Sequence, residues 1–389
     1  MLRTLAVLSV VFSLSACYGG LHSPEEDGGT GGTGTGGGTA TGGGTATGGG
    51  TGTGGGSATG GGTGTGGGMA TGGGTADAGR SNNPFQHSVL SLTSATGGII
   101  TGLAGQLGEM WAVLNNGRVY RRTDGGFGEL AGFSAATGWA DVYVAPDGAV
   151  FLASAARTLR WCLNNCTSAS AFSTFDISNT SATLDVVCGT SATNVFAVAR
   201  RDQSIAILYH WNGTQWTLVS NNLGLVFPQA CFMRPDGTLF IGGRRDIVRW
   251  EQGAASVETA SLDLTAFGAS VSGQVWWGLH GTGTAMMAVG GNQRALVRDD
   301  ATATWAIHTN PSNSFSTYNA VGLTAPNEAF AAGNVSSPKL YVSDGGPFAA
   351  AAVDLPAIGA VNNILVVNPN ELYFGGYDNS GPVIIRSKR

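Results

Sequence analysis

The chain has 389 residues and a net charge of −5, and only 11% of its residues are charged, while 42% are hydrophobic. The negative charge argues against a nucleic-acid binder, which needs a large positive field. Gly accounts for 65 residues, many of them in one tract before Arg80, so the folded part begins near Asn83 and is one large unit or two small domains. No segment after the N-terminus reaches the roughly 20 apolar residues of a membrane span.

The N-terminus has the pattern of a secretory signal. Arg3 is followed by an apolar run over residues 5–14 that is too short to span a membrane. Leu14-Ser15-Ala16-Cys17 resembles the lipobox of bacterial lipoproteins, in which the cysteine is lipidated after cleavage. The resemblance implies an anchor in the cell envelope through Cys17, and Tyr18 favours the outer membrane, on its periplasmic side or at the cell surface. The alternative is an ordinary signal peptide in which Cys17 has no role.

A spacer follows, since residues 28–76 are almost only Gly, Thr, Ala and Ser. Such residues bury no apolar area that would offset the entropy of ordering, so we expect a disordered coil with a mean reach of roughly 40 Å. The predicted organisation is a signal peptide over 1–16, the lipidated cysteine and a disordered linker over 17–84, and a folded domain over 85–389.

After the linker one pattern returns seven times. Its most regular part is a hydrophobic pair followed by small residues. The pair recurs at intervals of about 40 to 47 residues, which is typical of propeller blades. The pairs are Met110-Trp111, Val150-Phe151, Val195-Phe196, Leu239-Phe240, Met286-Met287, Ala329-Phe330 and Leu372-Tyr373. In the third repeat we expect strands at 184–188, 195–199, 204–211 and 216–220. Four strands per repeat and no amphipathic helix predict an all-β fold, a seven-bladed β-propeller of four-stranded antiparallel blades.

The seventh repeat lacks a fourth strand, and a strand-like run at 88–93 precedes the first repeat. We expect this run, within residues 85–93, to pair with residues 383–387 and close the ring. Closure would remove two exposed sheet edges.

Two turns, Thr123-Asp124-Gly125-Gly126-Phe127 and 343–348, resemble degenerate Asp-box turns, with weaker matches at 212–216 and 299–305. The chain therefore resembles Asp-box (BNR-type) repeat propellers, which include sialidase-like proteins. The resemblance implies a blade type rather than an activity. It also implies that the Asp of each box caps local backbone N–H groups and that the aromatic residue packs between sheets.

No catalytic residues are predicted. A sialidase needs an arginine trio, a paired Tyr nucleophile and an Arg-Ile-Pro-like motif, and the nearest match, Met233-Arg234-Pro235, aligns with the turn at 144–146 as repeat sequence. The five histidines, which are His22, His87, His210, His280 and His308, show no metal-ligand spacing. We therefore expect no metal and no cofactor.

The tryptophans follow the repeat. Trp161, Trp211 and Trp250 hold equivalent positions, which predicts packing between blades. Trp276 and Trp277 point to opposite faces of one strand, so one of them can line the central channel. The neighbouring segments 271–279 and 319–323 lack Asp and Glu, which argues against an enzyme at the channel.

Four cysteines remain besides Cys17, and export places them in an oxidising compartment. Three pairings are formally possible. We favour Cys162 with Cys166, which bracket a turn, and Cys188 with Cys231, which hold similar positions in adjacent repeats. The alternative is that these cysteines are small buried hydrophobic residues.

Arginine recurs where the second strand of a repeat turns into the third. The predicted binding rim consists of Arg118, Arg157, Arg200, Arg201, Arg244, Arg245 and Arg294. The forked N–H donors of arginine suit the carboxylates of an acidic protein or an anionic polysaccharide. The alternative is a set of ancestral hairpin copies in which each Arg pairs locally with an Asp.

The leading function is thus that of an envelope-anchored lipoprotein, expected to be monomeric, that displays a non-enzymatic propeller to a protein or an anionic glycan. Two alternatives stay open: a carbohydrate-active, sialidase-like hydrolase or lectin that uses the channel mouth, and a passive structural spacer.

Overall fold

The computed structural model describes residues 84–90, 92, 97–123, 126–133, 138–178, 181–202, 204–260, 262–263, 274–282, 285–308, 317–334, 339–351, 353–356 and 358–389. All of them lie in one compact unit, Ala70–Arg389. The signal, the lipobox with Cys17 and the spacer lie outside the described residues. Within the described ranges, no helix is long and apolar enough to cross a membrane.

The described chain is all-β apart from two short 3-10 turns, and its strands pair antiparallel in groups of four, which we call ladders. The first three ladders are β2 (Ile100–Gln106), β3 (Glu109–Leu114), β4 (Val119–Thr123) and β5 (Gly126–Glu129); β6 (Trp139–Val144), β7 (Val150–Ser154), β8 (Thr158–Cys162) and β9 (Ser173–Asp176); and β10 (Ala182–Ser191), β11 (Asn194–Arg201), β12 (Ile205–Trp211) and β13 (Trp216–Ser220).

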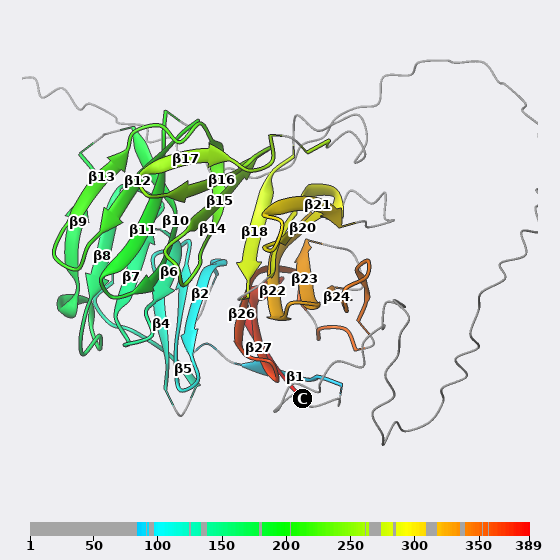
Figure 1. Ribbon diagram of the computed structural model, residues 1–389. Helices are drawn as coiled ribbons and strands as arrows, with labels where there is room; N and C mark the ends of the chain where they lie inside the picture. Colours follow the sequence, from blue (N-terminus) through cyan, green and yellow to red (C-terminus); the bar gives the residue numbers. More distant parts are fainter. Residues whose placement is uncertain are drawn as a thin grey trace, which may run out of the picture. The chain divides into compact units, whose positions relative to one another are not determined.

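The later ladders repeat this order (Figure 1). They are β14 (Val226–Met233), β15 (Leu239–Arg244), β16 (Ile247–Glu251) and β17 (Ala254–Val257); β18 (Trp276–Gly281), β19 (Ala285–Gly290), β20 (Ala295–Asp299) and β21 (Thr304–His308); β22 (Thr317–Ala325), β23 (Glu328–Asn334), β24 (Leu340–Ser343) and β25 (Ala349–Ala350); and β26 (Ala360–Asn368), β27 (Glu371–Asp378) and β28 (Gly381–Lys388) with β1 (Gln86–Leu90). The prediction of an all-β fold built from four-stranded antiparallel units is confirmed.

The ladders pack through their first strands. Each first strand contacts that of the next ladder, from β2 to β6 and onward to β26, and β26 contacts β2. Glycine permits the close approach at several crossings: a Cβ on Gly102 of β2 would lie 2.7 Å from the backbone nitrogen of Val142 in β6. The first strands are therefore arranged around a common centre.

Strand β1 completes the last ladder. It pairs antiparallel with β28, with Val89 opposite Ile385 and Leu90 opposite Ile384. In Figure 1 the blue β1 lies beside the red strands of the C-terminal ladder. The strand expected at the start of the domain is found over Gln86–Leu90, in the pairing that the sequence suggested.

Large side chains fill the seams between ladders. Trp211 packs against Trp161 of the preceding ladder, with 4.9 Å between ring centroids, as the repeated tryptophan positions predicted. Phe127 and Phe348, the aromatic residues of the two Asp-box-like turns, are also buried.

The capping implied for the Asp-box-like turns differs from expectation. At the turn after β24, the Ser343 hydroxyl accepts the Gly345 N–H and donates to the Gly346 carbonyl, while Asp344 is exposed. Asp124 lies outside the described residues. The two weaker matches do cap backbone groups, because Asn212 accepts the N–H groups of Thr214 and Gln215, and Asp299 accepts that of Ala301.

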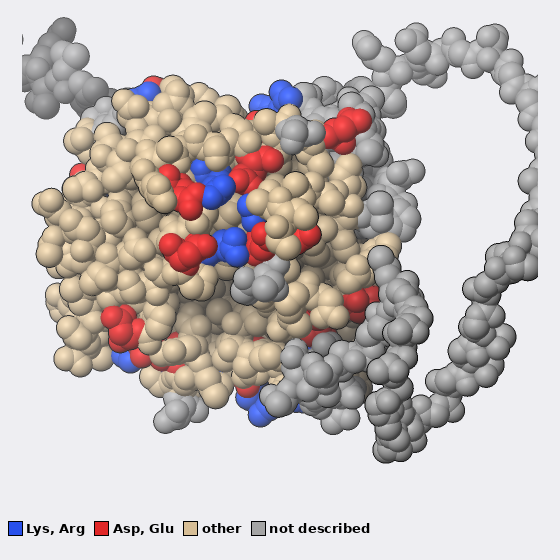
Figure 2. Space-filling view, viewed as in Figure 1, with Lys and Arg blue, Asp and Glu red and all other residues tan. Residues whose placement is uncertain are grey.

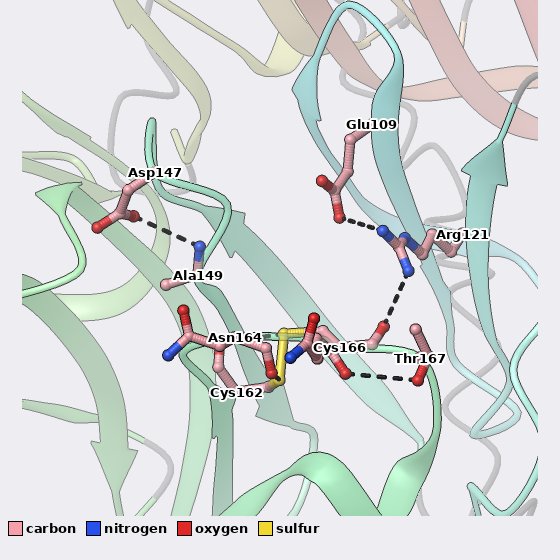
Figure 3. The surroundings of a disulfide bond; sticks show 9 residues. Glu109, Arg121, Asp147, Ala149, Cys162, Asn164, Cys166 and Thr167 are labelled. Atoms are coloured by element: carbon pink, nitrogen blue, oxygen red, sulfur yellow. Dashed lines mark hydrogen bonds and ion pairs between the residues drawn. A yellow bond between two sulfur atoms is a disulfide. The ribbon is translucent and has the colours of Figure 1, made fainter.

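Both expected disulfides are present. Cys162–Cys166 closes the turn after β8, and Figure 3 shows Arg121 beside it, donating to the Cys166 carbonyl at 3.4 Å while paired with Glu109 at 3.0 Å. Cys188–Cys231 joins the first strands β10 and β14 across a seam. The second disulfide thus ties two neighbouring ladders together.

Candidate binding face

The first strands share a structural irregularity near their starts, where each contains a register shift against the second strand of its ladder. Such a bulge re-aims the side chain that it carries. The shifts lie between Ile100 and Gly102, Trp139 and Asp141, Leu184 and Val186, Val226 and Ala230, Trp276 and Gly278, Tyr318 and Ala320, and Val361 and Asn363.

Several polar residues at these bulges bind the next first strand. Thr101 donates to the Trp139 carbonyl at 2.8 Å, and Asn319 donates to the Val361 carbonyl at 3.1 Å. Asn362 donates to the Ile100 carbonyl at 3.1 Å. These bonds join strand starts to strand starts, so the first strands run in the same direction around the centre. The connections between second and third strands, which lie beside these starts, therefore share one edge, which we call the rim.

Two acidic side chains stand at this level, and the sequence reasoning missed both. The segments 271–279 and 319–323, from which an acid-free channel was predicted, contain neither of them, because Asp141 lies on β6 and Asp185 on β10. Loss of hydration raises the pKa of each carboxyl to about 7. Asp141 accepts the N–H groups of Val142 at 2.8 Å and Val187 at 3.0 Å.

The Asp185 carboxyl pairs with Arg200 at 3.2 Å, and this charge partly opposes the rise in its pKa. Both acids thus have protein donors: both oxygens of Asp141 accept hydrogen bonds, one of them across the seam from β6 to β10, and Oδ1 of Asp185 accepts one within its own ladder, while its Oδ2 is buried without a hydrogen-bond partner. This arrangement favours structural roles over an acid pair aimed at a substrate.

His280 of β18 is also committed to the fold. Its Nδ1 accepts the N–H of Leu323 in β22 at 3.1 Å, which requires an unprotonated nitrogen. Burial lowers the pKa of His280 to about 4, so the ring is neutral at pH 7. His280 therefore serves as a hydrogen-bond acceptor between β18 and β22, which is a structural role.

The structure places all seven candidate arginines at or beside the rim, but it exposes them unequally. Arg244 and Arg245 are exposed, and Arg118, Arg157, Arg200 and Arg201 are half-buried. Arg294 is 7% exposed, and its guanidinium donates to the Gln274 side chain at 3.0 Å. The prediction that Arg294 belongs to an accessible rim is wrong, because its side chain is buried against Gln274, which precedes β18.

Acidic neighbours pair with several arginines of the predicted binding rim. Arg118 lies 3.8 Å from Glu129, and Arg201 lies 3.7 Å from Asp202. With the Arg200–Asp185 pair, these contacts agree with the alternative of local pairing for part of the set. The strongly exposed cations of the rim are Arg244 and Arg245.

Backbone strain gathers at the same edge. Among the described residues, eight that are not glycine have positive φ, a conformation that L-residues adopt only at a cost. Five of them lie at the rim or at the start of a first strand: Asp202, Phe227, Arg245, Asn292 and Gln293. Strained residues of this kind concentrate at binding sites, where surrounding contacts hold them.

The surroundings of Arg245 show how such strain is held. Its φ is 69°, its N–H donates to the Gln274 carbonyl at 2.8 Å, and its carbonyl accepts from the Trp276 indole at 3.0 Å. Trp276 is fully buried, whereas the adjacent Trp277, at a bulge, is half-exposed. The hairpin that carries Arg244 and Arg245 is thus fixed to the next ladder before any ligand arrives.

A second group of charges lies between the β14–β17 and β18–β21 ladders. Arg298 is 3% exposed and pairs with Glu258 at 3.0 Å and with Asp300. Arg234, the arginine of the sialidase-like match, pairs with Asp300 at 2.8 Å. Figure 2 shows acidic and basic side chains side by side over β14–β18, on a surface that is otherwise mostly uncharged. These arginines serve ion pairs of the fold, and the part of the chain that the structure describes contains no cluster of metal-ligating side chains.

No family model matches the chain, and no curated protein matches it. Solved structures are similar. One described as YCF48 bound to D1 peptide gives a TM-score of 0.58 at 14% identity, over 79% of this chain and 97% of that chain. A chain of the Mitotic Checkpoint Complex gives 0.56 at 12% identity, over 81% and 94%. YCF48 from Cyanidioschyzon merolae gives 0.56 at 11% identity, over 77% and 98%. At these identities the similarity shows the fold alone, and this chain has an all-β, propeller-like fold.

Proposed function

We propose that this chain is an envelope-tethered, non-enzymatic binding protein. In this proposal the ladders are the seven blades of one closed propeller, lipidated Cys17 holds the chain on the membrane, and the rim receives a protein partner. The observation that carries the proposal is the strained and fixed rim with its exposed Arg244 and Arg245. Ordering such a surface before binding lowers the entropic cost of association.

Three further observations support it. The first strands contact one another in order from β2 to β26, and β26 contacts β2, which supports a closed ring. The similar structures include one described as bound to a peptide and one described as a complex. The commitment of Asp141 and Asp185 to protein donors favours binding over hydrolysis at the channel mouth.

Site-specific photo-crosslinking in intact cells tests the binding face. A photoreactive residue at Arg245, Asn334 or Asn379, all exposed on the rim edge, should give an adduct with a discrete protein. The matched controls are Pro146, Pro235 and Asn327, which are exposed on the turns at the opposite edge. Equal adducts from both edges, or none from the rim, contradict the proposal.

Substitution of the lipobox cysteine tests the tether. The Cys17→Ser variant should leave the membrane fraction, because the acyl chains attached to this residue supply the apolar area that enters the bilayer. We expect a fall of at least tenfold in the membrane-bound share, measured by fractionation, together with loss of labelled fatty acid. The Cys162→Ser and Cys166→Ser double variant, which loses only the short-range disulfide, is the control for loss of a cysteine. Retention of Cys17→Ser in the membrane contradicts lipid anchoring.

A further inference from the structure

The β10–β13 and β14–β17 ladders are joined into one sheet where the start of β12, the third strand of its ladder, pairs with the start of β14, the first strand of the next. One residue pair, Ile205 of β12 with Val226 of β14, makes the junction and turns two ladders into one eight-stranded sheet. The junction lies at the rim, because Ile205 follows the connection from β11 to β12.

Pairing extends from this junction in both directions. Ile205 is opposite Arg201 of β11, Val226 is opposite Arg244 of β15, and Arg244 forms a bridge with Val275. Residues directly opposite one another in antiparallel strands carry side chains on the same face. The result is one continuous row across two ladders and the start of a third, which we call the cross-ladder row: Arg201, Ile205, Val226, Arg244 and Val275.

The row is accessible and held in place. Val226 is 39% exposed, Arg244 is exposed, and the other three members are half-buried. Beside Ile205, the Ala206 N–H donates to the Leu225 carbonyl at 3.0 Å, and beside Arg244, the Arg245 N–H donates to the Gln274 carbonyl at 2.8 Å. An exposed Val between two cations has no evident role within the fold.

The spacing of the row defines the ligand it fits. Neighbouring strands lie about 4.8 Å apart, so Arg201 and Arg244, three strands apart, are separated by roughly 14 Å. An extended chain rises about 3.3 Å per residue, so carboxylates on residues four positions apart are separated by roughly 13 Å. Arg201 forms an ion pair with Asp202 at 3.7 Å, but the Asp202 side chain is 61% exposed, and such surface pairs contribute little to stability.

We propose that the cross-ladder row binds an extended peptide segment in which two acidic residues, four positions apart, flank an apolar residue. The acidic side chains contact Arg201 and Arg244, and the apolar side chain covers Val226 and Ile205. The proposal rests on the proposed function, since it names the segment of the protein partner that the rim receives. Of the seven arginines of the predicted binding rim, this proposal assigns only Arg201 and Arg244 to ligand binding.

Fluorescence anisotropy with the full chain and synthetic peptides tests the row. The probe is a labelled nine-residue peptide with Asp at positions 3 and 7, Leu at position 5 and Gly or Thr elsewhere. Moving the second Asp to position 5 and the Leu to position 7, or replacing both Asp by Asn, should weaken binding at least tenfold. Added salt should weaken the parent peptide most, because its contacts are between exposed charges.

The variants make the assignment specific. Arg201→Ser and Arg244→Ser should each weaken binding about fivefold and together at least tenfold, and Val226→Asp should abolish it. Lys388→Ser removes one exposed charge on β28, far from the row in the sheet order, and should leave affinity within twofold. Circular dichroism of each variant checks that the fold persists.

The outcomes separate the row from the proposed function. If peptide spacing makes no difference, or Lys388→Ser weakens binding as much as Arg244→Ser, the row is wrong. If the same substitutions weaken the binding of a polyuronate equally, the row binds an anionic glycan instead, and the peptide proposal is also wrong. If crosslinks from the rim persist in the Arg201→Ser and Arg244→Ser double variant, the rim is still the binding face. The cross-ladder row is then not the part of the rim that binds the partner.

Discussion

Removal of residues 84–90 should lower the melting temperature by about 10 °C or more. The deletion takes away the β1–β28 pairing, the contact of Phe85 with Phe330 at 5.4 Å between centroids, and the bond between His87 and Ser387 at 2.6 Å. Each large apolar side chain returned to water costs about 1.5–3 kcal/mol. In a domain of about 300 residues 1 kcal/mol shifts the melting temperature by roughly 1.5–2 °C, so the lost side chains and strand pairing together account for the expected change.

The deletion should also promote self-association, because β28, a strand of eight residues, keeps β27 on one side but loses its partner on the other and becomes an exposed edge. Thermal unfolding followed by circular dichroism, with light scattering, measures both effects. Deleting residues 70–76 of the spacer is the matched control and should change neither. Phe85→Ala keeps β1 but removes one of its buried contacts, so it should show an intermediate loss of stability. This variant tests the contribution of the segment even if the deletion variant does not fold. A deletion variant that melts with the wild type would mean that β1 contributes nothing to the fold.

Loss of the Cys188–Cys231 disulfide should have the second largest effect. The two cysteines are 43 residues apart, and closing a loop of that length in the unfolded chain stabilises the fold by about 4 kcal/mol in the chain-entropy model. The short loop of Cys162–Cys166, with a separation of 4, gives about 2 kcal/mol by the same relation. The Cys188→Ala and Cys231→Ala double variant should therefore lose about twice the unfolding free energy of the Cys162→Ala and Cys166→Ala variant.

Urea unfolding of both double variants, beside the wild type with and without reductant, measures this ratio. Peptide mapping without reductant establishes that each pair is bonded at the start. If the two double variants are equally stable, loop length is not what makes Cys188–Cys231 stabilising. If reduction leaves the wild type unchanged, the pair between β10 and β14 contributes nothing.

The sequence alone was sufficient for the features that repeat. Alternating apolar residues and turn signals located the strands of the third repeat, including its fourth strand at Trp216–Ser220, because that alternation reflects burial within a single strand. Cysteines at similar positions in adjacent repeats identified Cys188 and Cys231 as partners. An unmatched strand-like run before the first repeat indicated β1.

Only the tertiary structure decided which side chains meet. The sequence placed Arg294 with six other arginines, yet its side chain is buried and donates to Gln274. It gave no sign that Asp141 reaches β10, or that Arg201, Ile205, Val226 and Arg244 lie in one row. These contacts depend on strand register, on bulges and on the way neighbouring ladders approach one another. Packing between distant segments sets all three, whereas the repeating pattern along the chain records only which residues of each strand face inward.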